Sequence, residues 1–307
     1  MNLSVELAPR NKRGLKLANP VMAASGTFGY GTEYESLFDI QRLGAIICKG
    51  TTLKPREGNP QPRIAETPSG MLNSIGLQNI GVDALIEQKA PEWAKWRVPV
   101  LVNIAGETVD EYGEIAGRLD SVPGVGGLEV NISCPNVDAG GAEFGTNPES
   151  AARVTAAVRK ATSLPVVVKL TPNTAEFVAV AIAVSRVGAD AVSLVNTLKG
   201  MAIDIRRRKP LLGNITGGLS GPAIKPVALR MVYEVARAVD IPVIGCGGVA
   251  GGHDAMEFLM AGASAVEVGS ASFASPSAAI DVLEGIEAFM DEENIADVSA
   301  IIGVARV

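Results

Sequence analysis

One stretch of the chain combines a reactive side chain with a local pattern that would expose it. Cys134 follows an apolar alternation over residues 130–132, which predicts a strand. Pro135 removes a backbone donor and disfavours helical geometry at Cys134, so the thiol should lie on a loop just past the strand end, between Asn131 and Asn136. A thiol there is placed to react, because loops on a rigid scaffold carry much of protein chemistry. It could equally be a small buried hydrophobe, and the local pattern leaves both interpretations open.

Polar residues also follow the ends of other apolar runs. Lys169 ends the run 165–168, so it lies either in a site or as the first solvated residue after a strand. If the runs are the strands of a barrel, their ends face one site, and this favours the first interpretation. That site would be rich in amides and would contain two lysines. Its members would be Ser25, Lys49, Asn103, Asn131, Cys134, Lys169, Asn196 and Thr197.

Glycine-rich segments follow the last two apolar runs, at 245–250 and 269–272. Glycine amides followed by a helix start form an anion cradle. The pattern Gly245-x-Gly247-x-x-Ala250 also matches a loose dinucleotide fingerprint, but it follows the seventh strand rather than the first. We therefore interpret these segments as the phosphate loops of a mononucleotide site.

The elements that must position these residues alternate along the chain. Eight apolar strands separated by helices, over roughly 250 residues plus insertions, predict a (β/α)8 TIM barrel of the α/β class, with a doubly wound sheet as the alternative. The absence of a composition break predicts one domain over residues 1–307. The expected strands lie at 21–24, 45–48, 100–103, 128–132, 166–169, 191–195, 243–245 and 265–268, and the clearest helices at 108–119, 148–162, 174–187, 223–238 and 252–261.

Three further segments refine this prediction. Thr108 and Asn147 are expected helix caps, the second followed by a proline in the first helical position. Residues 3–8 and 14–18 alternate weakly and predict an N-terminal hairpin. Segments 49–81 and 198–221 are too long for ordinary loops between strands and helices, so we expect insertions over the C-terminal mouth of the barrel.

Composition narrows the class of protein. The chain has 307 residues and a net charge of −6, and its one dense basic run, 206–209, suits a solvated loop edge rather than a nucleic-acid surface. No apolar run approaches the ~20 residues that cross a bilayer, and no signal-peptide pattern is seen. Cys48, Cys134 and Cys246 are far apart. This spacing argues against a disulfide framework, favours the cytoplasm, and leaves too few thiolates for an iron–sulfur cluster, which takes about four.

Metal chemistry is not expected, because no His, Cys and Asp residues have ligand spacing. The lone histidine, His253, stands at a helix start and is interpreted as a surface or capping residue. With no histidine at a strand end, catalysis must use a cysteine, a lysine or a carboxylate. Trp93 and Trp96 are interpreted as packing residues of the outer ring.

Five motifs together resemble the dihydroorotate dehydrogenase family, and the resemblance runs over nearly the whole chain. They are Asn131-Ile132-Ser133-Cys134-Pro135-Asn136, Asn73 to Asn79, Lys49 with Thr52 to Arg56, Asn196-Thr197, and Gly217 to Gly221.

The resemblance implies an FMN enzyme that oxidises dihydroorotate to orotate in pyrimidine biosynthesis. Cys134 would remove a proton from C5 while a hydride leaves C6 for the flavin N5. Lys49 suits the substrate carboxylate, and Lys169 could stabilise charge on the reduced flavin. The implied substrate contacts are Lys49, Asn73, Ser74, Ile75, Gly76, Leu77, Asn131, Asn196 and Thr197. The implied FMN contacts are Ser25, Lys49, Gly50, Asn103, Asn131, Lys169, Val195, Gly221, Gly247, Gly248, Gly269 and Ser270.

Within the family, residues 140–145 and 200–204 resemble the NAD-linked type. That resemblance implies a heterotetramer, in which a homodimer of this chain joins two partner chains that carry FAD and a 2Fe–2S cluster. A cysteine rather than a serine base also resembles the soluble class. Cys246 and Ser270 stand where the family often has Met and Thr, and we expect little effect because phosphate loops act through backbone amides.

Three alternatives remain at this point. One is a fumarate-linked homodimer, which fumarate or NAD added to the pure chain would distinguish. Another is a dihydropyrimidine dehydrogenase-like subunit, which Lys49 opposes, since neutral uracil offers it no carboxylate. The third is a flavin-holding electron-transfer or scaffold subunit, in which Cys134 would only be part of the core.

Overall fold

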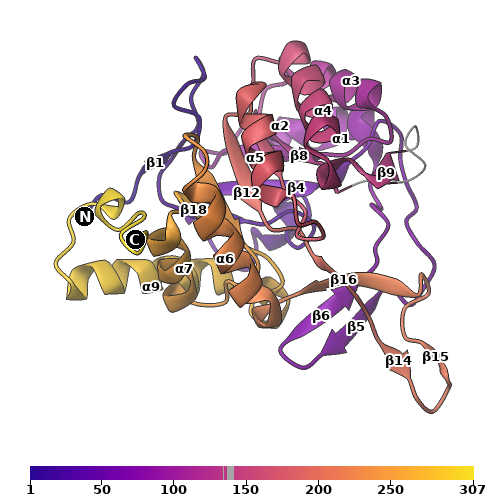
Figure 1. Cartoon of the computed structure of the whole chain (residues 1–307). Helices are drawn as coiled ribbons and strands as arrows, with labels where there is room; N and C mark the ends of the chain where they lie inside the picture. The colour runs from indigo at the N-terminus through magenta and orange to yellow at the C-terminus, as the bar shows by residue number, and fades with distance from the viewer. Residues whose placement is uncertain (134, 137–141) are drawn as a thin grey trace.

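The computed structural model describes residues 1–133, 135–136 and 142–307, and in this part of the chain eight parallel strands close into a barrel (Figure 1). Each strand pairs with the next in sequence, and the last pairs with the first. This closure confirms the predicted (β/α)8 barrel and excludes the doubly wound sheet. The strands are β3 (Val21–Ala23), β4 (Ala45–Thr51), β7 (Val100–Ile104), β8 (Val125–Asn131), β11 (Val166–Lys169), β12 (Ala191–Leu194), β17 (Val243–Cys246) and β18 (Ala265–Val268).

Helices surround the barrel (Figure 1). The predicted caps are confirmed: Thr108 accepts from the Glu111 amide and Asn147 from the Ser150 amide, so each satisfies a free donor of the first turn. None of the helices in the described ranges combines the length and the apolar character that a membrane crossing requires. The helices are α1 (Gly81–Gln88), α2 (Ala90–Trp93), α3 (Val109–Leu119), α4 (Pro148–Ala161), α5 (Phe177–Arg186), α6 (Lys225–Ala236), α7 (Gly252–Ala261), α8 (Ala271–Ala274) and α9 (Ala278–Glu292).

Short elements complete the chain. The 3-10 turns are η1 (Thr32–Tyr34), η2 (Ile40–Arg42), η4 (Phe144–Thr146), η5 (Pro222–Ile224) and η6 (Val298–Ala300). A two-residue pair, β9 (Pro135–Asn136) and β10 (Ala142–Glu143), follows β8.

The barrel strands are nearly continuous buried apolar runs, because helices cover one face and the interior of the barrel covers the other. Residues 166–168 of β11, for example, are all valines that are 0% exposed. Three of the exceptions are charged: Glu129, Lys169 and Glu267 are buried within the same strands. A buried charge is costly unless it is paired, so these three residues must compensate one another.

The two long insertions meet in one antiparallel sheet. From the first come β5 (Ile64–Thr67) and β6 (Gly70–Asn73), and from the second β13 (Leu198–Met201) and β16 (Thr216–Ser220), in the order β13-β16-β6-β5. They leave the barrel after β4 and β12, at the C-terminal ends of the strands. Figure 1 shows this sheet projecting from the barrel, with the hairpin of β14 (Ile203–Asp204) and β15 (Lys209–Pro210) at its tip. The basic run 206–209 is exposed there, as predicted.

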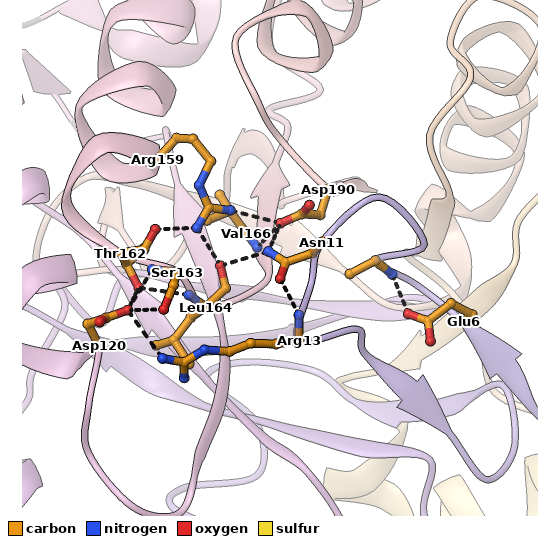
Figure 2. A network of polar contacts seen from close by, with 11 residues as sticks. Glu6, Asn11, Arg13, Asp120, Arg159, Thr162, Ser163, Leu164, Val166 and Asp190 are labelled. Carbon is orange, nitrogen blue, oxygen red and sulfur yellow. Dashed lines mark hydrogen bonds and ion pairs between the residues drawn. The ribbon is translucent and has the colours of Figure 1, made fainter.

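The predicted N-terminal hairpin is present as β1 (Val5–Glu6) and β2 (Lys16–Leu17). Its loop contacts the N-terminal ends of β11 and β12, where Asn11 Nδ2 donates to Asp190 Oδ2 at 3.1 Å. Figure 2 shows the surrounding contacts, which we call the basal network. Its members are Asn11, Arg13, Asp120, Arg159, Thr162, Ser163, Leu164, Val166 and Asp190.

Candidate functional site

An amide cluster lies where β8 and β12 end. Asn196 Nδ2 donates to Asn131 Oδ1 at 3.3 Å and to Ser133 Oγ at 3.1 Å, and the Thr197 amide donates to Asn196 Oδ1 at 2.8 Å. The Tyr112 hydroxyl donates to the Asn131 carbonyl at 2.6 Å and fixes the end of β8. The structure therefore brings together three residues predicted to bind substrate.

The inserted sheet brings Asn73 to this cluster. Asn73 Nδ2 donates to the Gly218 carbonyl at 3.3 Å, and the two residues pair in register. A Cβ on Gly218 would lie 1.9 Å from Thr197 Oγ1, so only glycine lets Thr197 pack against this strand. Asn73 and Thr197, far apart in sequence, thus share one neighbour.

The loop after β6 reaches the ends of β4 and β7. A Cβ on Gly50 would lie 3.1 Å from Asn103 Oδ1 and 3.2 Å from Leu77 Cδ2, so the loop packs directly on β4. Gly76 and Leu77 both have positive φ, of 74° and 54°, a conformation in which a leucine is uncommon. Lys49, half-buried next to Gly50, makes no ion pair with any described residue. It is a cation available to a ligand.

Ser74 and Ile75, two predicted substrate residues, form hydrogen bonds to other residues of the chain. The Ser74 hydroxyl accepts from Asn59 Nδ2 at 2.9 Å, and the Ser74 amide donates to the Arg63 carbonyl at 2.7 Å. The Ile75 carbonyl accepts from the Asn59 amide at 3.0 Å. These bonds fix the shape of the loop that carries Gly76 and Leu77.

The glycine loops converge on the other side of the mouth. Gly221, Gly247 and Gly248 have φ of 100°, 119° and 81°, and turns with such residues form anion-binding nests. A Cβ on Gly248 would lie 3.0 Å from the Gly221 carbonyl, and one on Gly221 would lie 3.6 Å from Ser270 Oγ. The structure thus brings together loops from β16, β17 and β18, as the phosphate interpretation requires.

The remaining predicted FMN residues lie between these groups. The Val195 amide donates to the Cys246 carbonyl at 2.7 Å, and Ser25 Oγ donates to the Cys48 carbonyl at 3.0 Å. Gly269 follows β18 directly, and a Cβ there would meet nothing closer than Ala24 at 3.5 Å. All three residues adjoin the C-terminal ends of barrel strands.

Below the mouth lies a buried ionic group, Glu129, Lys169 and Glu267, which we call the central triad. Lys169 Nζ contacts Glu267 Oε2 and lies 3.4 Å from Glu129 Oε1. Glu129 also accepts from Asn103 Nδ2 at 2.6 Å and from Ser193 Oγ at 2.8 Å. Lys169 is therefore buried among carboxyl groups and is not the first solvated residue after the strand.

Burial opposes the charged form of Lys169, but Cys246, Glu129 and Glu267 together raise the pKa of Lys169 well above its ordinary value. Burial raises the pKa of the Cys246 thiol far above neutrality, so the two carboxyl groups supply the negative charge at neutral pH. Lys169 remains a cation. Neither glutamate was among the predicted site residues, although the signal was present: each is an acidic residue in the middle of an apolar strand, at 128–130 and 266–268.

Cys134 and residues 137–141 lie outside the described residues, so the structure does not test the predicted base. β8 ends at Asn131 and a turn follows, which agrees with the expected strand end just before Cys134. Cys48 and Cys246, the other two cysteines, are buried and free.

The positions of Trp93 and His253 agree with their sequence interpretations. Trp93 is 2% exposed and donates to the Tyr30 carbonyl at 2.9 Å, so it packs as expected. The His253 side chain is 86% exposed, as predicted for a surface residue. Together with Asp254 and Glu257 it forms a possible metal-ligand group within the described ranges. Lys225 Nζ, 2.7 Å from Asp254 and 2.6 Å from Glu257, already pairs with both carboxylates.

A surface depression of about 450 Å³ lies at the opposite end of the barrel. Its lining includes Arg159 and Asp190 of the basal network, which mark the N-terminal ends of the strands. The candidate site is at the other end, where the amide cluster, Lys49 and the glycine loops meet above the central triad. That arrangement of amides, an unpaired cation and a glycine cradle can bind an anionic ring compound next to a phosphate-bearing cofactor.

Comparison with known proteins identifies the family. A family model described as dihydroorotate dehydrogenase matches residues 9–290. The chain belongs to the dihydroorotate dehydrogenase family. One relative, named dihydroorotate dehydrogenase B (NAD(+)), catalytic subunit, from Pelobacter propionicus, is 58% identical over 95% of this chain and 96% of its own length. Proteins of the same name from Geotalea uraniireducens and Desulforamulus reducens are 57% and 53% identical, over 98% and 100% of this chain and 97% and 99% of their own lengths.

Family membership confirms the resemblance inferred from the five motifs. The structure adds that three of those motifs, around Asn73, Asn131 and Asn196, meet at one mouth although about 120 residues separate the first from the last.

Proposed function

We propose that this protein is a flavoenzyme that oxidises dihydroorotate to orotate in pyrimidine biosynthesis. Family membership gives the reaction, and the observation that supports the substrate is Lys49. It is a half-buried cation without an ionic partner among the described residues, and it lies near the end of β4, at the same end of the barrel as the asparagine side chains of the amide cluster. A carboxylate on a ring that carries amide groups satisfies both features.

The residues fit FMN as the cofactor. Positive φ at Gly221, Gly247 and Gly248 provides a nest for its phosphate. Lys169, a buried cation at the end of β11, would face the ring system, and Asn103 would bind nearby. Bound FMN would supply the oxidising chemistry by accepting a hydride from C6 of the substrate.

The chain's own residues would bind the substrate and move a proton. Lys49 would hold the carboxylate, and Asn73, Asn131 and Asn196 would hydrogen-bond the ring amides and fix its orientation. Orientation of this kind contributes much of the rate in enzymes, because it replaces a chance encounter by a fixed geometry. We propose Cys134 as the base that takes the proton from C5, and the remaining predicted residues as contacts of substrate and FMN as given above.

We further propose NAD⁺ as the final electron acceptor, reached through a second subunit. The relatives are named as catalytic subunits of an NAD(+) enzyme, and such a name supports a partner chain. We propose that the partner carries FAD and a 2Fe–2S cluster and that two copies of each chain form a heterotetramer. The free cysteines Cys48 and Cys246 support a cytoplasmic location, and the continuous core supports one domain over residues 1–307.

The test is anaerobic titration of the FMN-loaded chain, followed by the visible flavin spectrum. Dihydroorotate should bleach the flavin. Dihydrouracil, which lacks the carboxylate, should bleach it far more slowly. The chain alone should form no NADH with NAD⁺. Lys49→Ala should weaken orotate binding by about 10–100-fold, the effect of losing one charge-assisted hydrogen bond, and affect FMN binding much less.

Lys95→Ala, an exposed lysine after α2, is the matched control and should bind orotate normally. Unchanged orotate affinity in Lys49→Ala contradicts the role given to this lysine. Rapid turnover of the isolated chain with fumarate contradicts the partner subunit and supports the homodimeric alternative.

A further inference from the structure

The central triad carries two acids and one base directly below the proposed site. Glu129 precedes Asn131 by two residues on β8, so both side chains point to the same side of the strand and Glu129 lies one layer deeper. Lys169 pairs in register with Asn131, and Glu267 lies two residues before Gly269 of the phosphate loop. Both glutamates are 0% exposed. The floor of the mouth is therefore an ionic group with more acids than bases.

The two carboxyl groups have unequal surroundings. Glu129 accepts from Asn103 and Ser193 and lies within 3.4 Å of the Lys169 ammonium. Glu267 contacts Lys169 through Oε2, but its Oε1 accepts from no donor among the described residues. Hydrogen bonds to the charged form favour ionisation, so Glu129 is the carboxylate that remains ionised.

Glu129 and Glu267 both contact the ammonium of Lys169, and both are fully buried. Two buried carboxylates beside one ammonium would leave an uncompensated negative charge, so one member of the pair keeps its proton. The unequal surroundings assign that proton to Glu267. With Lys169 protonated, the triad is neutral, as a fully buried group should be.

The pKa values agree with this assignment. Burial and the nearby Glu129 carboxylate raise the pKa of Glu267 to about 8. Burial alone would also raise the pKa of Glu129, but the Lys169 ammonium and the hydrogen bonds from Asn103 and Ser193 hold it below its ordinary value.

The other titratable groups near the pair stay neutral. Cys246 on β17 pairs in register with Glu267, and Cys48 on β4 is close enough to Glu129 for the two groups to interact electrostatically. Burial raises the pKa of both thiols well above neutrality. On β3, Met22 pairs in register with Glu267, and a methionine side chain does not titrate. The proton near neutral pH therefore belongs to Glu267.

We propose that Glu129 and Glu267 form a carboxyl pair that shares one proton below the flavin, and that at alkaline pH, where the oxidised protein has lost this proton, Glu267 takes one up from solvent when the flavin is reduced. This inference rests on the proposed FMN site. Hydride transfer brings two electrons and one proton, so the reduced cofactor gains negative charge. Where the oxidised protein holds Glu267 as a carboxylate, that charge favours the protonated form, and Glu267 takes a proton from solvent. Glu267 is thus a positioning residue that acts through Lys169 and not a catalytic residue.

The first measurement is the infrared spectrum of the oxidised, FMN-loaded protein as a function of pH. Wild type should show a carboxylic-acid band at neutral pH that disappears as the pH rises through about 8. Glu267→Gln should lack this band, and Glu92→Gln, an exposed glutamate of α2, should keep it. This measurement requires no dihydroorotate, so it tests the pair even if the proposed reaction is wrong.

The second measurement is the pH dependence of the FMN midpoint potential, with dithionite as reductant. Its slope counts the protons taken up with two electrons. Above the resting pKa of Glu267, wild type and Glu92→Gln should take up one proton more than Glu267→Gln. Glutamine keeps the hydrogen bond to Lys169, so a purely structural role would leave the proton count equal in all three proteins.

Specific results of these two measurements would contradict the proton uptake by Glu267. Equal proton counts, or a band that persists in Glu267→Gln, overturn the proposal. If Glu267→Gln does not fold, wild type alone decides, because a constant slope from neutral to alkaline pH contradicts proton uptake. Failure of dihydroorotate to bleach the flavin contradicts the proposed function but leaves both of these measurements interpretable.

Discussion

The basal network and the central triad are two ionic groups in the same barrel, and they differ in how their charges are balanced. In the basal network, Arg159 Nη1 lies 3.0 Å from Asp190 Oδ2, and Arg159 Nη2 donates to the carbonyls of Thr162 and Leu164. Asp190 also accepts from the Val166 amide at 2.8 Å (Figure 2). Arg159 and Asp190 thus form one pair, and Arg13 lies 3.8 Å from Asp120, so the network has one guanidinium for each carboxylate.

The central triad instead has two carboxyl groups for one ammonium, and Glu267 Oε1 accepts no hydrogen bond from a described residue. The difference shows that the two ends of the barrel have different roles. Polar groups at the N-terminal ends of strands satisfy one another and hold the chain together, whereas those at the C-terminal ends retain capacity for a ligand. Changes at the two ends should therefore affect different measurements.

The largest expected effect is on the chemistry of the mouth. Cys134→Ala should slow reduction of bound FMN by dihydroorotate by roughly 10²–10⁴-fold, because the reaction loses its general base. FMN binding and the melting temperature should stay near those of wild type. Single-turnover stopped flow measures the rate. Reduction at nearly the wild-type rate would sink the assignment of Cys134 as base and favour its role as part of the core.

An intermediate effect is expected on the free energy of unfolding when the basal network is changed. Asp190→Ala leaves Arg159 without its carboxylate and the Val166 amide without its acceptor. Breaking a buried pair costs about 3–5 kcal/mol, but the Arg159 side chain is 24% exposed and water can reach it, so we expect a loss of about 2–3 kcal/mol. Urea unfolding at neutral pH measures this loss.

The comparison between the two ends requires that the Asp190→Ala protein, once folded and loaded with FMN, is reduced at the wild-type rate. Asp291→Ala, an exposed residue of α9, is the control and should unfold like wild type. A slowed flavin reduction in Asp190→Ala would show that the two ends are coupled.

The smallest expected effect is a pH dependence of the free energy of unfolding that comes from Asp120 of the basal network. Asp120 accepts from the Thr162 hydroxyl and the Ser163 amide, and these hydrogen bonds lower the pKa of Asp120 to about 2. An unfolded aspartate has a pKa of about 3.9, so the stabilisation is present above about pH 4 and is lost as the pH falls toward 2. The side chain is 28% exposed, and solvent screening reduces the contribution to about 1 kcal/mol.

Asp120→Asn should therefore lower the free energy of unfolding at pH 7 and differ less from wild type at pH 3. Urea unfolding at both pH values checks this prediction. A difference that is the same at both values would mean that the carboxylate charge contributes nothing.

Much of the fold could be predicted because the local patterns agree with it. Runs such as 166–168 are apolar on every residue, as parallel strands buried on both faces require, and caps such as Thr108 and Asn147 mark helix starts by short-range hydrogen bonds. Family motifs added the site residues, since each motif is a contiguous stretch that can be recognised without the fold.

The partners of those residues could not be predicted. Asn73 and Thr197 meet across Gly218 only because two insertions form one sheet, and strand pairing between distant segments depends on tertiary packing. The same holds for the basal network, in which Asn11 from the N-terminal hairpin reaches Asp190.

The sequence by itself determined a (β/α)8 barrel of the dihydroorotate dehydrogenase family, because hydrophobic periodicity and contiguous motifs are properties of the chain. Only the tertiary structure decided what surrounds each charge. In the sequence, Glu129 and Glu267 are single acidic residues in two apolar strands, 138 positions apart. Closure of the barrel brings them together on Lys169, shielded from bulk solvent. Burial beside a second carboxylate, which no local pattern encodes, makes one of them retain its proton.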